Sequence, residues 1–359
     1  MRAYWQMAQR LSRYWEVPFG IVLGRMVLGR IMYNRGPIEF DEFRFATKPV
    51  SLWRTFLPGK ELRRLQEACA PAASRKWEED KLRFALRCVE HGLPTVPITG
   101  VIPALTDGVD TSHAPSVSRI GSAPALCALF TALHDFDGFA KPLASGQGYG
   151  AFAFSVRNGR LVPSRHHATE EQMYIACATS RFPGAGYLLQ PRVVTHEQLR
   201  PFMPGPGLGT VRVFSFRTAQ DDVVIPFATL RIPAAGEECD NWQFNAMGAS
   251  INVESGVIGK AVGRTTARTL LHPITAHPET AAVFADSVVP CWPEVLTLVR
   301  AAAHAFPMLP ALGWDVAITT DGPLLIETNW QFGAECAEIL TDRGWAAEFR
   351  ALYARCARS

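Results

Sequence analysis

Several features are missing from this sequence, and each absence excludes a class of protein. No window approaches the ~20 consecutive apolar residues of a membrane-spanning helix, and the first residues lack the apolar core of a signal peptide. None of the eight cysteines stands in a C-x-x-C pair, which argues against a zinc site. The net charge of +3 is spread widely, which argues against a nucleic-acid-binding protein. We therefore expect a cytoplasmic protein with reduced, buried cysteines.

What is present is the composition of a large globular protein. The 359 residues are long for one core and predict two or three packed subdomains. Apolar residues make up 48% and charged residues 19%, which is the balance of a folded chain. The oligomeric state stays open, and a homodimer is compatible with the sequence.

Residues 1–35 differ from the rest because they carry six arginines against one acidic residue, Glu16, together with many apolar side chains. Amphipathicity is the ordinary signature of a packed helix, so the favoured interpretation is a helix pair that packs on the body of the protein. The alternative is a basic amphipathic helix that lies on an anionic membrane surface.

The remaining chain predicts strands and helices that interleave without a regular βαβ period, which indicates an α+β or mixed α/β fold. The expected helices are 78–91, ended by Gly92, then 292–305 and 334–357. The expected strands are 139–143, 151–156, 160–162, 187–190, 210–216, 223–232, 249–253, 314–319 and 324–329. Asn158-Gly159 predicts a tight hairpin turn between the second and third of these strands.

A glycine-rich loop, 145–150, follows a short strand that carries Lys141. Its glycines let the backbone approach a ligand closely, and successive N–H groups can hold phosphate. The loop matches neither the P-loop motif nor the dinucleotide-binding fingerprint, because it leads into a strand. Alternatives are a hairpin tip without function and, for Lys141, an edge-strand lysine that blocks aggregation. A lysine among apolar residues otherwise predicts a bound anion.

Glu327 and Asn329 are two residues apart on an apolar strand, so both side chains point to one face. A hard cation with oxygen ligands would satisfy them, and Asp315 on the preceding strand could be a third ligand. A two-residue Asp321-Gly322 turn would turn Asp315 away from Glu327, so we predict a loop with an odd number of residues.

Arg212 and Arg231 lie in the middle of apolar strands, where an arginine pairs with a carboxylate or a phosphate. Either a catalytic role or a structural buried ion pair would explain them. Asp240-Asn241 and Asn252 could contact a substrate, but the favoured interpretation is that they make turns. No G-x-S-x-G elbow supports serine hydrolysis, and the histidines show no metal spacing.

The order of these motifs resembles the ATP-grasp superfamily over residues 76–335. Lys81, in the helix that leads to Gly92-Leu-Pro-Thr-Val-Pro97, looks like the first nucleotide-binding lysine, and this stretch is similar to D-alanine–D-alanine ligases. Tyr187–Gln190 looks like the hinge that binds adenine. Four segments together look like the sugar-transfer-associated branch of the superfamily. They are Thr210-Val-Arg212, Leu230-Arg231-Ile, Asp240-Asn241-Trp242 and Gly313-Trp-Asp315-Val-Ala.

The resemblance implies an ATP-grasp fold, in which a nucleotide is held between two α+β subdomains. It divides the chain into a helical region 1–75, a nucleotide-binding subdomain 76–192 with a lid at 139–165, and a catalytic subdomain 193–359. The implied nucleotide-binding residues are Lys81, Lys141, Ser145, Gly146, Gln147, Gly148, Tyr149, Gln190, Arg192 and Glu197. The implied metal ligands are Asp315, Glu327 and Asn329, for two Mg²⁺ ions that Mn²⁺ could replace.

The implied activity is that of an ATP-dependent carboxylate–amine ligase, which joins a small acid to an amine through an acyl-phosphate. The alternatives are an ATP-grasp kinase and a non-catalytic scaffold of polysaccharide assembly. Two positions depart from the ligase pattern. Gly313 stands where the ligases often have an arginine, so Arg212 or Arg231 would take the catalytic role. Pro191 stands where an acidic residue is usual, so Glu197 would contact the ribose.

Overall fold

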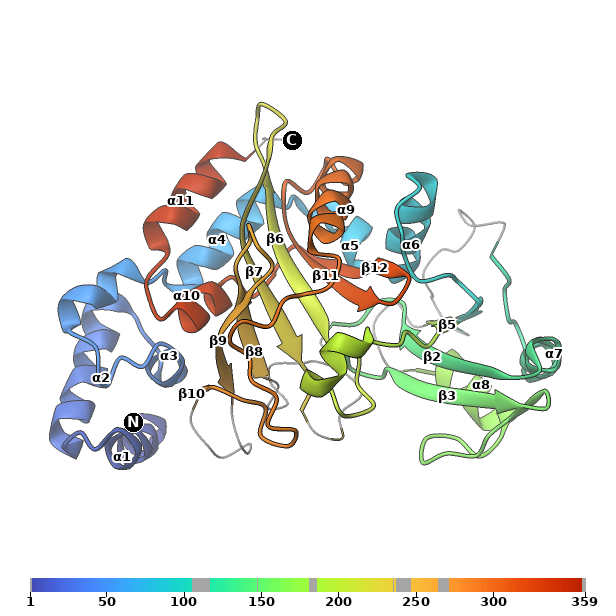
Figure 1. The fold of residues 1–359 in the computed structure, drawn as a ribbon, viewed down its shortest axis with the longest axis horizontal. Coiled ribbons are helices and arrows are strands. Elements are labelled where there is room, and N and C mark those ends of the chain that lie inside the picture. Colours follow the sequence, from blue (N-terminus) through green and yellow to red (C-terminus); the bar gives the residue numbers. More distant parts are fainter. Residues whose placement is uncertain are drawn as a thin grey trace.

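The computed structural model describes residues 2–104, 117–146, 148–180, 186–234, 236, 247–263 and 271–356. Two antiparallel sheets form the centre of the molecule, and helices cover them (Figure 1). This arrangement confirms the mixed α/β class. No helix within the described ranges is both long enough and apolar enough to cross a membrane.

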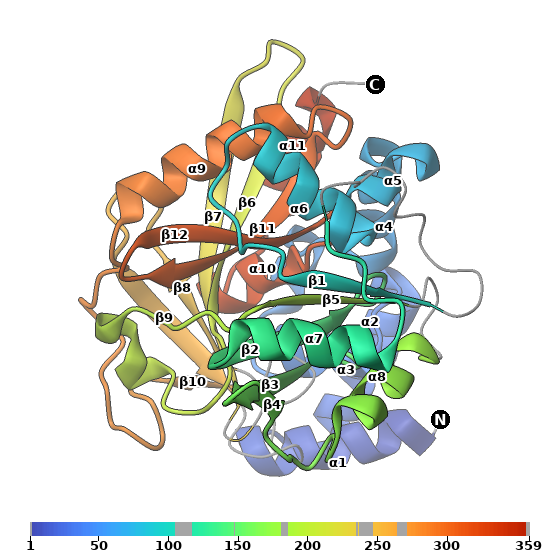
Figure 2. The same ribbon diagram turned by 90° about the vertical axis from the view of Figure 1, so that its right-hand side faces the viewer.

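The smaller sheet has the strand order β1-β5-β2-β3-β4. Its strands are β1 (Gly100–Pro103), β2 (Phe136–Pro142), β3 (Phe152–Arg157), β4 (Arg160–Leu161) and β5 (Gly186–Pro191). Helices α7 (Ala123–Leu133) and α8 (Glu170–Ala178) share an apolar core with this sheet, and Figure 2 shows α7 running alongside its strands. The predicted turn between β3 and β4 is confirmed, since Asn158 and Gly159 both have positive φ angles, 51° and 75°.

The larger sheet has the strand order β10-β9-β8-β7-β6-β11-β12. Its strands are β6 (Thr210–Arg217), β7 (Val223–Ile232), β8 (Met247–Ile251), β9 (Ile258–Gly263), β10 (His272–Ile274), β11 (Ala311–Thr319) and β12 (Gly322–Asn329). Helix α9 (Trp292–Ala305) packs on one face, in a core with Val211 and Val213. Phe214 and Phe216 point to the other face, into a second core with helix α10 (Glu335–Thr341). Side chains alternate along a strand, so Arg212 shares the face of Phe214.

The N-terminal region is helical and packs against the second core. It consists of α1 (Arg2–Trp15), α2 (Phe19–Tyr33), α3 (Pro37–Glu42), the 3₁₀ helix η1 (Val50–Thr55) and α4 (Gly59–Cys69). The C-terminal helix α11 (Ala346–Arg355) joins the same core. The buried carboxylate of Glu338 accepts the backbone N–H groups of Leu57 and Trp345, which ties the two regions together. The predicted packed helix pair is therefore confirmed.

Two predicted helices are each divided in the structure. The helix expected at 78–91 is α5 (Ala72–Glu79) followed by α6 (Lys81–Glu90), because Asp80 accepts the N–H groups of Leu82 and Arg83 and starts a new helix. The helix expected at 334–357 breaks at Asp342, whose backbone is left-handed (φ 56°). Strands β1, β9 and β10 were not predicted. The subdomain boundaries at 75/76 and 192/193 stay a prediction, although β1–β5 and β6–β12 fall on either side of the second.

Candidate active site

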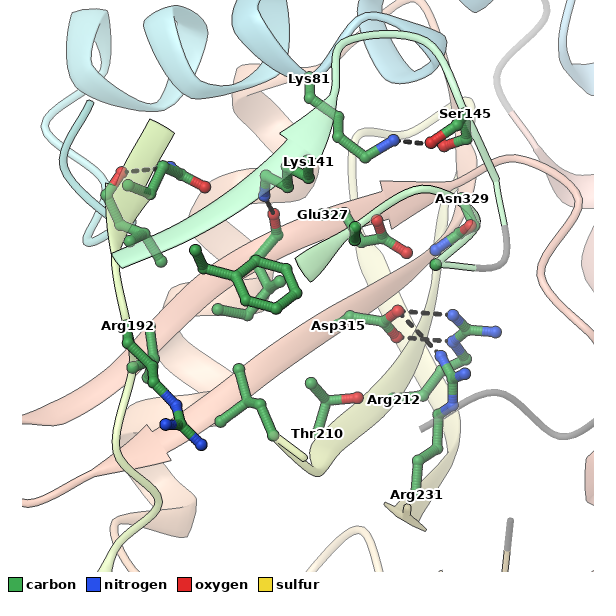
Figure 3. A pocket seen from close by; sticks show the side chains of 18 of the residues that line it. Lys81, Lys141, Ser145, Arg192, Thr210, Arg212, Arg231, Asp315, Glu327 and Asn329 are labelled. Atoms are coloured by element: carbon green, nitrogen blue, oxygen red, sulfur yellow. Dashed lines mark hydrogen bonds and ion pairs between the residues drawn. The ribbon is translucent and has the colours of Figure 1, made fainter. Parts of the chain in front are cut away.

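A cavity of about 370 Å³ lies between the two sheets (Figure 3). Strands β2 and β5 of the smaller sheet line one side, and strands β6, β7, β11 and β12 of the larger sheet line the other. Its size is within the range of about 300–1,000 Å³ that small-molecule sites occupy. The predicted site residues on its walls are Lys81, Lys141, Ser145, Gly148, Gln190, Arg192, Arg212, Arg231, Asp315, Glu327 and Asn329.

Two lysines, one on a helix and one on a strand, reach the cavity. Lys81 is the first residue of α6, and its ammonium donates to the carbonyl oxygen of Ser145 in the glycine loop. Lys141 lies on β2, and its ammonium is 3.5 Å from the carbonyl oxygen of Ile326. Both are largely buried, 9% and 8% exposed. Because β2 lies between β5 and β3, the edge-strand explanation of Lys141 is wrong. Buried ammonium groups at a cavity wall favour a bound anion.

The hairpin of β11 and β12 brings Asp315 opposite Glu327, as predicted, but by another device. The prediction of an odd-length loop is wrong, because Thr319 pairs with Gly322 across a two-residue turn. The register instead shifts by one between Asp315 and Val316, which leaves Ile326 as a β-bulge. Without the bulge, Asp315 would face Ile326, and Glu327 would point to the opposite side of the sheet.

Asp315 is held by two arginines (Figure 3). Arg212 lies opposite it on β6 and donates from Nε to Oδ1 at 2.7 Å and from Nη2 to Oδ2 at 2.6 Å. Arg231 on β7 donates from Nη1 to Oδ2 at 2.9 Å. Burial by itself would raise the pKa of Asp315, but the two guanidinium groups hold the pKa below its usual value. The structural ion pair is thus present, and both arginines also line the cavity.

The group of Asp315, Glu327 and Asn329 fits the ligand chemistry of a hard cation. Glu327 lies within hydrogen-bond range of Asp315, and two carboxylates so close repel unless a proton or a cation lies between them. The side-chain nitrogen of Asn329 is buried without a hydrogen-bond partner, and a half-turn of the amide would place its oxygen there. Among the described residues, no three His, Cys, Asp or Glu side chains form a metal-binding group.

Gly313 has no room for a side chain. A Cβ atom at this position would come within 2.3 Å of the Cβ of Phe332. An arginine could therefore enter here only if Phe332 moved, whereas Arg212 and Arg231 reach Asp315 from the neighbouring strands. That Arg212 or Arg231 takes the catalytic role of an arginine at residue 313 stays a prediction.

Two further carboxylates at the site were missed in the sequence. Glu335, at the start of α10, lines the cavity, and burial raises its pKa. Glu78 on α5 does not line the cavity, but burial, together with the neighbouring Glu327 and Glu79, raises the pKa of its carboxyl group to about 8, which favours the protonated form at neutral pH. Its position three residues before Lys81, on a turn of the same expected helix, was the signal that could have drawn attention to it.

Replacing Glu78 by glutamine is expected to change how stability depends on pH. A carboxyl group whose pKa is raised on folding stabilises the protein below its unfolded pKa, and this contribution is lost as pH rises through about 8. In a chelating buffer, the free energy of unfolding of Glu78→Gln relative to wild type should therefore increase between about pH 5 and pH 8.5, by at most about 1.4 kcal/mol per pH unit. Urea titrations would measure it. Glu67→Gln, at an exposed position on α4, is the control, and equal pH profiles for all three proteins would contradict the expectation.

The other predicted site residues lie as follows. Gln190 is buried and donates from its amide to the carbonyl oxygen of Val96, while Arg192 donates to that of Pro206. Gly146, Tyr149 and Glu197 are not among the residues that line the cavity, and Glu197 is exposed at the start of the 3₁₀ helix η2 (Glu197–Phe202).

Four polar positions complete this comparison with the sequence. Gln147, Asp240 and Asn241 lie outside the described residues. Asn252 makes a turn, as predicted, by accepting the N–H groups of Glu254 and Ser255.

Two sheets that enclose a cavity with lysines on one side and carboxylates on the other are the arrangement of an ATP-grasp fold. The chain matches the sugar-transfer associated ATP-grasp family over residues 76–352, and it belongs to that family. No curated protein matches it.

Solved structures with some similarity include D-alanyl-alanine synthetase A from Vibrio cholerae O1 biovar eltor, at 14% identity and a TM-score of 0.45, covering 79% of this chain and 66% of that one. Biotin carboxylase from Campylobacter jejuni is 13% identical with a TM-score of 0.43, and the match covers 80% of this chain and 49% of that one. N5-carboxyaminoimidazole ribonucleotide synthetase is 11% identical with a TM-score of 0.36, and the match covers 72% of this chain and 46% of that one. The chain thus spans about half the length of the last two proteins.

Proposed function

We propose that this protein is an ATP-dependent carboxylate–amine ligase that works through an acyl-phosphate. The observation that carries the proposal is the opposition of charges across one cavity. Lys81 and Lys141 line the side of the smaller sheet, and the carboxylates of Asp315 and Glu327 line the side of the larger sheet. A triphosphate with a cation would lie between these walls. The lysines would contact the phosphates, and the carboxylates would contact the cation.

The reaction would proceed in two displacements. A carboxylate oxygen of the acid attacks the γ-phosphorus of ATP, the bond to the β-phosphate oxygen breaks, and ADP leaves. The amine nitrogen then attacks the acyl carbon, inorganic phosphate leaves, and the nitrogen loses a proton. Lys81 and Lys141 would hold the phosphates, and Arg212 and Arg231 would face the charge that develops on the acyl oxygen.

Asp315, Glu327 and Asn329 would hold Mg²⁺, which supplies compensation for the charge of the phosphates when it is bound. Whether the site takes one or two ions, and whether Mn²⁺ replaces them, belongs to the proposal. The glycine loop would restrict water, since its Ser145 carbonyl already contacts Lys81 and its Gly148 lines the cavity.

Product analysis tests the proposal. Purified protein is incubated with Mg²⁺, ATP and pools of small acids and amines, and ADP, phosphate and coupled products are measured by mass spectrometry. ADP with phosphate and an amide supports the ligase. ADP with a stable phosphoester would show a kinase, and absence of ATP binding by calorimetry would show a scaffold; either result overturns the proposal. Lys141→Met should lower turnover, whereas Lys60→Met, at an exposed position on α4, should not.

A further inference from the structure

Helix α2 has apolar residues on two sides, and within the part of the chain that the structure describes only one side packs against other elements. Val22, Met26 and Gly29 are buried against the body of the protein. A Cβ atom on Gly29 would come within 2.6 Å of the ring of Phe40, so this contact is close. The burial of Val22, Met26 and Gly29 fixes which side of the helix faces outward.

The opposite side of α2 carries an exposed apolar row, which we call the outer stripe: Ile21, Gly24, Val27 and Ile31. Their spacing of three or four residues places them along one line of the helix. Ile21 is 52% exposed, Val27 44% and Ile31 77%. A Cβ atom on Gly24 would have no atom within 4 Å, so the stripe is open. Single exposed apolar side chains are ordinary, but a row of them along one helix marks an interaction surface.

The charge around the outer stripe selects the partner. Arg30 on α2 is exposed, and the exposed side of α1 carries Arg2, Arg10 and Arg13. Residues 1–35 contain only one acidic residue, Glu16. An anionic lipid surface offers both an apolar layer for the stripe and negative charge for the arginines.

We propose that helices α1 and α2 dock the protein peripherally on an anionic lipid bilayer, with α2 parallel to the surface and its outer stripe inserted about 5–10 Å into the interfacial layer. No described helix could span the bilayer, so the contact is peripheral. In Figure 1 these helices lie at the left of the molecule, and strands β2 and β3 of the cavity lie at the right. The proposal stands independently of the ligase activity.

Vesicle flotation with the full chain tests this proposal. The probes are phosphatidylcholine vesicles and vesicles that contain about 30% phosphatidylglycerol, with binding measured at low and high salt. We expect binding to the anionic vesicles, little binding to the neutral ones, and weaker binding at high salt. The triple variant Ile21→Gln, Val27→Gln, Ile31→Gln should bind at least about tenfold less. Arg10→Gln with Arg13→Gln should reduce binding and flatten its salt dependence.

The matched control is a triple glutamine variant at Val89, Ile175 and Val194, which are 63%, 49% and 60% exposed elsewhere. It should bind like wild type, and circular dichroism and thermal unfolding should show that both triple variants fold. Absence of wild-type binding, or equal binding by both triple variants, overturns the proposal. Light scattering that shows a dimer dissociated by the stripe variant would also overturn it, because the stripe would then join two copies.

Discussion

Replacing Glu327 by alanine should reduce ATP turnover by about 10³-fold or more, because the change removes one of the two carboxylates that face each other across the β11–β12 hairpin. The remaining Asp315 already accepts three hydrogen bonds from Arg212 and Arg231, so it cannot replace the lost charge. The measurement is ADP formation in the presence of Mg²⁺, with any acid and amine that the wild type accepts.

Glu254→Ala serves as the matched control, since Glu254 is exposed in the turn after β8 and should tolerate the change. Unfolding curves of both variants show whether the fold is kept. ATP turnover by Glu327→Ala at the wild-type rate would contradict the proposal that Glu327 is a metal ligand. If Glu327→Ala loses turnover but still binds ATP, Glu327 acts on the reacting phosphate. Calorimetry of ATP binding separates this case from a loss of nucleotide binding.

Replacing Arg212 by methionine is expected to destabilise the fold by about 3–5 kcal/mol. Asp315 is 3% exposed, and without Arg212 it keeps only the contact from Arg231. In wild type, the lowered pKa of Asp315 contributes stability above the unfolded value of 3.8, which is lost as the pH falls through the folded pKa. In the variant, burial should raise the pKa of Asp315, so stability should instead fall as the pH rises.

Urea unfolding at several pH values measures this change in stability. Two further variants show whether the buried charge of Asp315 causes it. Asp315→Asn in the Arg212→Met background should recover part of the loss, because it removes the buried charge. Arg350→Met breaks the exposed pair with Glu61 and should cost no more than about 1 kcal/mol. If Arg212→Met lowered the free energy of unfolding no more than Arg350→Met, the ion pair between Arg212 and Asp315 would not stabilise the site.

The local parts of the site could be predicted from the sequence. Glu327 and Asn329 share a face because side chains alternate along any strand, and this needs no knowledge of neighbouring strands. The turn at Asn158-Gly159 and the helix at 292–305 were also predictable, since each depends on residues that are adjacent in the chain. The family resemblance extended this prediction to Lys81 and Lys141, which line the same cavity.

The register of the central hairpin could not be predicted in this way. The sequence indicated that Asp315 should face Glu327, but it gave no sign that a bulge at Ile326 would achieve this. A bulge depends on how two strands fit against their neighbours, and the residues of the turn do not determine it. The same limit applies to Glu78, which the sequence placed on a helix without showing that its carboxyl group approaches Glu327.

The sequence by itself therefore predicted which residues would meet at the cavity: the lysines, the carboxylate and amide two residues apart, and the arginines within apolar strands. Only the tertiary structure decided which of them meet. Arg212 is 103 residues from Asp315 in the chain, and they become partners because β6 and β11 are neighbours in one sheet. The outer stripe of α2 follows the same rule, since its pattern is local but its exposure depends on what packs against the other side of the helix.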